Sequence, residues 1–169
     1  MPRHLVIMGA AGSGKTTVAT TLSEHLGWIA AEADEFHSAA SIAAMASGVP
    51  LTDADRWPWL ESIRAWMSTQ AQNGRSTIVA CSALKRSYRE VLSLADGRVQ
   101  FVHLAGAAEV LAERMETRRG HYMPVSLLPS QLEALEPLEQ DEDGLTLDFL
   151  QTPGRISAKI LEGLLLTGA

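Results

Sequence analysis

Residues 9–16 read Gly9-Ala10-Ala11-Gly12-Ser13-Gly14-Lys15-Thr16 and match the phosphate-loop pattern G-x-x-x-x-G-K-[ST] at every fixed position. The apolar residues 4–8 in front of the loop predict a buried strand, and residues 15–25 behind it predict a helix. Three glycines allow the backbone to turn its N–H groups toward a polyphosphate, and the positive end of the helix dipole faces the same anion. A Gly-rich turn that matches by chance is the alternative, but the strand, loop and helix in register favour a nucleoside triphosphate site.

Within this loop, each residue type has an expected task. Lys15 is expected to reach the outer phosphates and to act in catalysis, and the Thr16 hydroxyl is expected to hold Mg²⁺. The residues expected to bind the nucleotide here are Gly9, Gly12, Ser13, Gly14, Lys15, Thr16 and Thr17.

Length and composition limit the class of protein. At 169 residues, 46% of them hydrophobic, the chain suits one domain with a packed core, spanning 1–169. The formal net charge of −6 argues against a nucleic-acid partner held by bulk charge. Cys81 is the single cysteine, which excludes an internal disulfide and favours a reducing compartment.

No apolar run approaches the roughly 20 residues that span a bilayer. The short apolar run after Met1 leads directly into the loop, unlike a signal peptide, so we expect a cytoplasmic protein without a membrane partner.

Apolar runs alternate with helical stretches along the chain, which predicts a parallel sheet covered by helices on both faces. Strands are expected at 4–8, 28–33, 76–81, 99–104 and 145–149. Helices are expected at 15–25, 38–47, from 52 or 53 to 72, 84–94, 107–117, 130–136 and 153–166. The predicted fold class is therefore α/β, with a five-stranded parallel sheet between helices.

Ligands of open parallel sheets bind beyond the carboxyl ends of the strands, where the second expected strand is followed by Asp34. This carboxylate can accept a proton from a substrate hydroxyl or steer Mg²⁺ through water, and its alternative role is to cap the next helix. His37, close behind, is on sequence alone more typical of a hydrogen-bonding loop residue than of a ligand.

Basic residues suggest where an anionic substrate binds. Arg56 can form either an exposed ion pair or a two-pronged hydrogen-bonded pair with a substrate carboxylate. The sequence favours neither role over the other. Ser82 and Lys85 follow the third strand, and the cations up to Arg89 are unfavourable near the positive end of a helix, which suggests a bound anion or a solvated face. No Asp ends this strand, so Mg²⁺ has to rely on Thr16, the phosphates, water and Asp34.

A mobile lid is expected at about 118–135, where a basic helix end meets a loop broken by two prolines. An Arg that swings over the phosphates neutralises charge in the transition state, whereas an ordinary basic helix end is the alternative. The residues concerned are Arg114, Arg118, Arg119 and His121. Arg155, in the stretch 152–155, is a candidate nucleotide contact by position only.

Five segments together resemble the gluconate kinase family of small phosphate-loop kinases. They are 9–17, 34–37, 45–60, 81–85 with Tyr88 and Arg89, and 118–122. The resemblance covers nearly the whole chain, and the third and fourth segments are far more specific than the loop. It implies a fold similar to shikimate and nucleoside-monophosphate kinases, with a core sheet, a substrate-binding helical part at about 36–75 and a lid.

The resemblance also implies an activity, which is transfer of the γ-phosphate of ATP to the 6-hydroxyl of D-gluconate by a Mg²⁺-dependent homodimer. It places Asp34 and His37 near the sugar acid, with Arg56 and either Lys85 or Arg89 at its carboxylate. The further residues that it assigns to the reaction or the substrate are Ser82, Arg118, Arg119 and His121. One departure is Glu32-Ala33-Asp34, where relatives commonly show Asp-Gly-Asp.

Two other functions compete with this interpretation. One is a small-molecule kinase for another acceptor, either shikimate-like or a different sugar acid. The other is a GTPase-like switch, which is disfavoured because no guanine-specifying Asn-Lys-x-Asp is present and the one Asp-x-x-Gly, at 141–144, lies in a late acidic loop.

Overall fold

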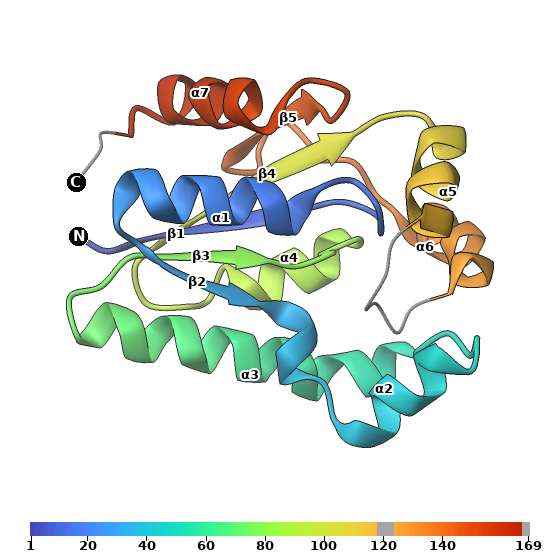
Figure 1. Ribbon diagram of the computed structural model, residues 1–169. Coiled ribbons are helices and arrows are strands. Elements are labelled where there is room, and N and C mark those ends of the chain that lie inside the picture. The colour runs from blue at the N-terminus through green and yellow to red at the C-terminus, as the bar shows by residue number, and fades with distance from the viewer. Residues whose placement is uncertain (118–123, 167–169) are drawn as a thin grey trace.

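The computed structural model describes residues 1–117 and 124–166, and a five-stranded sheet lies at its centre (Figure 1). The strand order is β2-β3-β1-β4-β5, and every neighbouring pair is parallel. The strands are β1 (Arg3–Met8), β2 (Ile29–Glu32), β3 (Thr77–Ala80), β4 (Arg98–Ala105) and β5 (Gly144–Asp148). The predicted five-stranded parallel sheet is confirmed, with each strand close to its expected position.

Helices cover both faces of this sheet, as the alternating pattern predicts. They are α1 (Lys15–Leu26), the 3₁₀ turn η1 (Ala33–Phe36), α2 (Ala39–Ala46), α3 (Asp53–Gln72), α4 (Arg86–Leu92), α5 (Ala108–Thr117), the 3₁₀ turn η2 (Val125–Leu127), α6 (Leu128–Ala134) and α7 (Pro153–Gly163). In the described part of the chain, no helix combines the length and the apolar content needed to cross a membrane. The described residues of the expected lid form η2 and α6.

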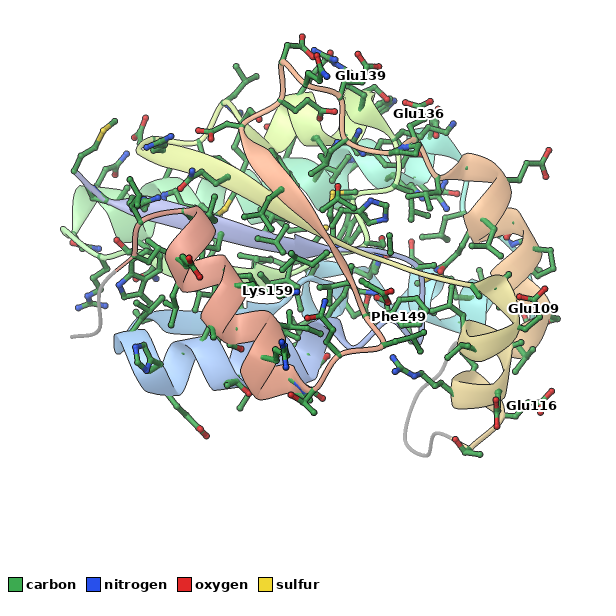
Figure 2. All side chains as sticks on the ribbon, turned by 90° about the horizontal axis from the view of Figure 1, so that it is seen from above. Glu109, Glu116, Glu136, Glu139, Phe149 and Lys159 are labelled. Atoms are coloured by element: carbon green, nitrogen blue, oxygen red, sulfur yellow. The ribbon has the colours of Figure 1, made fainter. Side chains whose placement is uncertain are left out.

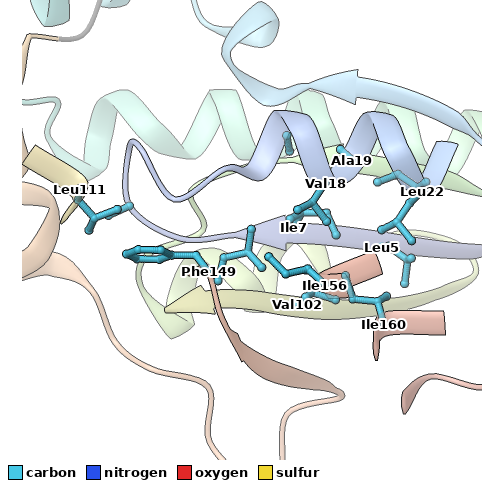
Figure 3. Close-up of a cluster of buried hydrophobic side chains, with 14 of the residues drawn as sticks. Leu5, Ile7, Val18, Ala19, Leu22, Val102, Leu111, Phe149, Ile156 and Ile160 are labelled. Atoms are coloured by element: carbon cyan, nitrogen blue, oxygen red, sulfur yellow. The ribbon is translucent and has the colours of Figure 1, made fainter. Parts of the chain in front are cut away.

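Successive side chains of the central strand β1 point to opposite sides of the sheet, and helices cover both sides. Side chains on both faces of β1 are therefore buried. Leu5 and Ile7 join the cluster under α1 and α7, which Figure 3 shows together with Phe149 at the end of β5. Val6 and Met8 join the opposite cluster under α3 and α4. The loop that follows β1 therefore leaves the sheet at its middle, between two packed layers.

His4 is a polar residue within this core, at 0% exposure. Its Nε2 lies 2.8 Å from the carbonyl oxygen of Asp96, so Nε2 carries the proton, and its Nδ1 accepts from the Thr77 hydroxyl at 2.7 Å. Burial lowers the pKa of His4, although the Asp96 carbonyl opposes the shift. The native protein therefore holds this ring neutral over a pH range in which the unfolded chain protonates it.

The free energy of unfolding is expected to fall as the pH is lowered from 7.5 to 5.5, because His4 then binds a proton in the unfolded chain but stays neutral in the native protein. A folded pKa below the ordinary value near 6.5 gives a loss of at most about 1.4 kcal/mol per pH unit for one such group. Urea unfolding at several pH values measures the slope. His4→Gln removes this titrating group and leaves all others unchanged. The free energy of unfolding of this variant should therefore depend less steeply on pH than that of the wild type. Equal slopes in the two proteins would contradict the assignment.

Candidate active site

The phosphate loop connects β1 to α1, and its shape depends on glycine. Gly12 and Gly14 have φ values of 86° and 96°, in the left-handed region that L side chains rarely adopt. A Cβ at Gly9 would lie 2.8 Å from the Leu104 carbonyl oxygen, so the loop also packs closely on β4. The N–H of Gly9 donates to the Ser82 carbonyl at 3.3 Å, which ties the loop to the end of β3. The loop thus presents its remaining N–H groups at the start of α1.

Lys15 lies where two cavities meet. One has a volume of about 380 Å³ and the other about 330 Å³, and Lys15 and Thr16 line both. The Lys15 Nζ donates to the carbonyl oxygens of Gly9 and Ala10 at 3.0 and 3.1 Å. A group held in one cavity and a group held in the other can therefore approach each other at this ammonium and the neighbouring hydroxyl.

The larger cavity, which we call the nucleotide cavity, opens beside the start of α1 toward α5 and α7. Its lining residues are Gly12, Ser13, Gly14, Lys15, Thr16, Thr17, Val18, Arg114, Thr117, Phe149, Gln151, Pro153 and Ile156. Arg114 donates to the Gly12 carbonyl at 3.2 Å and to the Phe149 carbonyl at 3.4 Å, and its guanidinium lies 4.8 Å from the centre of the Phe149 ring. Figure 2 shows Phe149 where β5 ends. The position of Arg114 suits a contact with a nucleotide.

Arg155 is not among these lining residues. Its side chain is exposed, and its backbone N–H donates to the Thr152 hydroxyl at the start of α7. The structure therefore does not place Arg155 at the cavity, because α7 turns Pro153 and Ile156 toward it instead, and the contact with a nucleotide stays a prediction. Gly9 also lies outside the lining and acts through the shape of the loop.

The smaller cavity, which we call the acceptor cavity, is acidic. Its lining residues are Ala11, Lys15, Thr16, Glu32, Asp34, Glu35, Ala80, Ser82, Met115 and Gln131. The structure thus places Asp34 and Ser82 beside Lys15, as the positions at the strand ends predict. Glu32, where the sequence departs from the family pattern, also lines this cavity, and an interaction with Thr16 opposes the rise in its pKa. Burial raises the pKa of Glu32, and the negative charge of Asp34 adds to the rise.

His37 lies next to the acceptor cavity. Its ring stacks on Trp59, with ring centres 4.1 Å apart and planes 13° apart, and Trp59 is itself fixed by donating to the Ala33 carbonyl at 2.7 Å. Burial lowers the pKa of His37, Asp34 opposes the shift, and Arg56 adds to it. Its Nδ1 is buried and has no hydrogen-bond partner among the described residues. A neutral ring beside Asp34 can offer this nitrogen to a hydroxyl group.

Arg56 and Lys85 come together around one carboxylate at the start of α3. This helix begins with a capping box, in which the Thr52 hydroxyl accepts from the Asp55 N–H and the Asp55 carboxylate accepts from the Thr52 N–H. The box fixes the first turn, which carries Asp53 and Arg56.

Asp53 contacts both cations directly. The Lys85 ammonium lies 3.3 Å from both Asp53 oxygens, the Arg56 guanidinium lies 3.9 Å from one of them, and the Tyr88 hydroxyl donates to the same carboxylate. Arg56 also donates to the Tyr88 hydroxyl at 3.1 Å. The hydrogen bond from Tyr88, with help from both cations, lowers the pKa of Asp53. The two predicted anion-binding cations are thus adjacent and already balanced in part by Asp53.

The prediction that Arg89 contacts the substrate is wrong. Its side chain is 1% exposed and forms a two-pronged ion pair with Glu142, at 2.6 and 3.0 Å. Its Nη1 donates to the carbonyl oxygens of Ala83 and Leu84. Although burial opposes it, the hydrogen bonding from Arg89 keeps the pKa of Glu142 below its usual range.

The anion suggested by the cationic start of α4 is the protein's own acidic segment, residues 139–143. Arg86 pairs with Glu139 at 2.7 Å and with Asp141 at 2.6 Å, and Arg98 pairs with Asp143 at 2.9 Å. Figure 2 labels Glu139 on this segment. The sequence correctly indicates a negative partner for these cations, but the partner is internal.

Two further expectations concern the lid residues and a metal ion. Arg118, Arg119 and His121 lie outside the described residues. Within the described residues, no group of three or more His, Cys, Asp or Glu side chains is placed to hold a metal ion. The side-chain oxygen donors that line the cavity with Lys15 are those of Thr16, Glu32, Asp34, Glu35, Ser82 and Gln131.

Comparison with known proteins places this geometry in a family. The family described as "AAA domain" matches residues 5–138. A gluconokinase from Gluconobacter oxydans is 50% identical over 141 residues, which cover 83% of this chain and 79% of that protein. The solved structure of a sugar kinase from Janibacter sp. HTCC2649 is 52% identical with a TM-score of 0.94, covering 98% of this chain and 96% of that one. A gluconokinase structure from Sinorhizobium meliloti 1021 is 42% identical with a TM-score of 0.86, covering 97% and 92%.

Glu142→Gln is expected to destabilise the fold strongly, because it leaves the buried Arg89 guanidinium without its counter-charge. Breaking a buried pair in this way costs about 3–5 kcal/mol. Asp141→Asn is the matched control. Asp141 is the residue before Glu142 and belongs to an exposed pair with Arg86, so its loss should leave the melting temperature nearly unchanged. Thermal unfolding of both variants measures the difference. Equal melting temperatures would contradict a structural role for the Arg89–Glu142 pair.

Proposed function

The chain belongs to the gluconokinase family of phosphate-loop kinases, and we propose that it transfers the γ-phosphoryl group of ATP to the 6-hydroxyl of D-gluconate. The products are 6-phospho-D-gluconate and ADP. The observation that carries this proposal is the meeting of the nucleotide cavity and the acceptor cavity at Lys15 and Thr16. Direct transfer between two bound molecules needs such an arrangement, because the donor phosphorus and the attacking oxygen have to be aligned.

In this proposal, ATP occupies the nucleotide cavity. The N–H groups of the loop and the start of α1 bind the phosphates, and Lys15 exchanges its bonds to the Gly9 and Ala10 carbonyls for phosphate oxygens. Arg114 lies beside the same loop and adds a positive charge. Arg118 and Arg119 are proposed to close over the phosphates as part of the lid, with His121 nearby on the acceptor side.

The residues around Thr16 fit a magnesium ion. Mg²⁺ prefers oxygen ligands and keeps several of its waters, so it is bound by few protein groups together with phosphates. The Thr16 hydroxyl is the direct ligand in this proposal, with Glu32 and Asp34 as partners of its waters. When bound, the ion neutralises charge on the phosphate oxygens. The interaction between Thr16 and Glu32 supports this assignment, because it already brings a negative group to the hydroxyl oxygen.

We assign the acceptor cavity to gluconate. Asp34 orients the 6-hydroxyl and accepts its proton, and His37 offers its unpartnered Nδ1 to another hydroxyl. The carboxylate end meets Arg56 and Lys85, and it competes there with Asp53. Ser82 and Asp34 line the cavity itself, whereas Arg56 and Lys85 are not among its lining residues. Since the cations and Asp34 lie on different elements, the substrate is held at both ends, which aligns the hydroxyl with the phosphate.

We also propose that the enzyme is a homodimer that works in the cytoplasm, as the family resemblance implies. Cys81 is the single cysteine of the chain, so no internal disulfide can form, which is typical of proteins from a reducing compartment. Sedimentation analysis of the purified protein tests the dimer.

A coupled assay for ADP release tests the choice of acceptor. With MgATP, gluconate is expected to give much faster turnover than glucose, shikimate or AMP, because only gluconate offers both a terminal hydroxyl for Asp34 and a carboxylate at the right distance for Arg56. The products are identified by mass spectrometry. Equal or faster turnover with shikimate or glucose would overturn the substrate assignment and leave the kinase assignment intact.

Asp34→Asn is expected to lower kcat by about 10²–10⁴, the usual contribution of a positioned general base, and to change the affinity for ATP little. The variant keeps the shape of the side chain and removes its ability to accept the proton. Steady-state kinetics with gluconate and nucleotide titration separate the two effects. Glu24→Gln is the matched control, since Glu24 is an exposed carboxylate on α1 that lines neither cavity and has no assigned role. An unchanged kcat in Asp34→Asn removes the assigned role.

A further inference from the structure

Gln131 joins the phosphate loop to a segment that is remote in the sequence. It lies on α6 and is 9% exposed, and its Oε1 accepts a hydrogen bond from the backbone N–H of Ala11 at 2.7 Å, across 120 residues of chain. Ala11 is the third residue of the loop. A side chain of α6 that lines the acceptor cavity therefore holds one of the loop's own amide groups.

The loop needs support from outside because its glycines leave its backbone free to move. Its internal contacts include the bond from the Ser13 N–H to the Ala10 carbonyl, at 3.2 Å, and the two bonds from Lys15 to carbonyl oxygens. The Lys15 bonds are the ones that bound phosphates replace. The bond from Ala11 to Gln131 is independent of them, so it can hold the loop in one shape before and after nucleotide binding.

The segment that carries Gln131 also contacts the substrate-binding helical part. Leu127, at the end of η2, packs with Met45 and Leu51 in a small apolar cluster separate from the two main cores. Met45 belongs to α2, and Leu51 leads into the start of α3. Figure 1 shows α6 at the end of the sheet where α1 begins, with α2 on the same side of the molecule. Residues 125–134 thus contact the phosphate loop through Gln131 and the helical part through Leu127.

We propose that Gln131 is a positioning residue that keeps the phosphate loop in its anion-binding shape, and that Leu127 couples the Gln131–Ala11 hydrogen bond to the position of α2 and α3. This assignment rests on the proposed nucleotide site but not on the identity of the acceptor. Movement of the helical part on substrate binding then reaches the loop through a single short helix. Neither residue takes part in the chemistry.

The first test compares three variants by nucleotide binding alone. Gln131→Met has a similar size and no acceptor, and it is expected to weaken ADP binding about tenfold, because the Ala11 N–H loses its partner in a partly buried place. Glu133→Gln, at an exposed position on the same helix, is the matched control and should bind ADP as the wild type does. Leu127→Ala should weaken ADP binding by about threefold, although it touches neither cavity. Calorimetric titration with ADP gives the dissociation constants, and melting temperatures check that each variant is folded.

Combining the two changes tests the link. If Leu127 acts through Gln131, the double variant binds ADP no more weakly than Gln131→Met alone. Independent, additive losses would overturn the link, and wild-type affinity in Gln131→Met would overturn the positioning role. A protein that binds ADP in this pattern but does not phosphorylate gluconate contradicts the proposed function only.

Amide hydrogen exchange provides a readout that a general loss of stability does not reproduce. In the wild type, the Ala11 amide should exchange slowly, and in Gln131→Met it should exchange much faster while the core strand β1 stays protected. Gln131→Glu keeps an oxygen at the same place and should keep Ala11 protected. Rapid exchange of Ala11 in the wild type itself would overturn the proposal even if a variant fails to fold.

Discussion

The structure depends on the turn by which the chain leaves β1 and enters α1. Because β1 is the middle strand of a parallel sheet, this turn lies where the carboxyl ends of all strands meet, with β3 on one side and β4 on the other. The close approach of Gly9 to the Leu104 carbonyl and its bond to Ser82 fix the turn to both neighbours. The residues assigned to binding or transfer lie along this edge of the sheet, near the turn. Elements far apart in the sequence therefore bring their side chains close to Lys15.

Among the residues that the structure describes, Arg56, Lys85 and Arg89 are already paired with carboxylates, and the Arg89 pair serves the site indirectly. Ala83 has a φ of 43°, an unusual value for a residue with a side chain, and it directly follows Ser82 in the acceptor cavity. The Arg89 guanidinium donates to the Ala83 carbonyl while Glu142 holds it from the other side. The buried ion pair therefore fixes a strained turn at the cavity wall. The acidic segment 139–143 contributes to the site through this support and not through contact with ligand.

The sequence predicts the parts of the structure that depend on local patterns. The strands, the order of elements and the phosphate loop follow from short-range periodicity and glycine spacing, and Asp34 follows from its position after a strand. Pairings across the chain could not be predicted in this way. Arg89 carries the same charge whether its partner is a substrate or Glu142, 53 residues away, and only the fold decides between them. The same is true of Glu32 with Thr16 and of Gln131 with Ala11, since no spacing rule connects residues on different elements.

In the proposed function, charge distribution explains how a net-negative protein can select and orient an anionic acceptor. The acceptor cavity has three carboxylates, Glu32, Asp34 and Glu35, so the carboxylate of a sugar acid is repelled from the end nearest Lys15. The cations Arg56 and Lys85 lie around Asp53, whose own charge keeps the cluster only weakly positive. A substrate that brings its carboxylate there gains hydrogen bonds by displacing or sharing those of Asp53, while a neutral sugar gains little. The opposite end of the substrate, an uncharged alcohol, is the part that the acidic end of the cavity tolerates. Repulsion at one end and exchange of ion pairs at the other therefore favour the single orientation in which the terminal hydroxyl faces the phosphate.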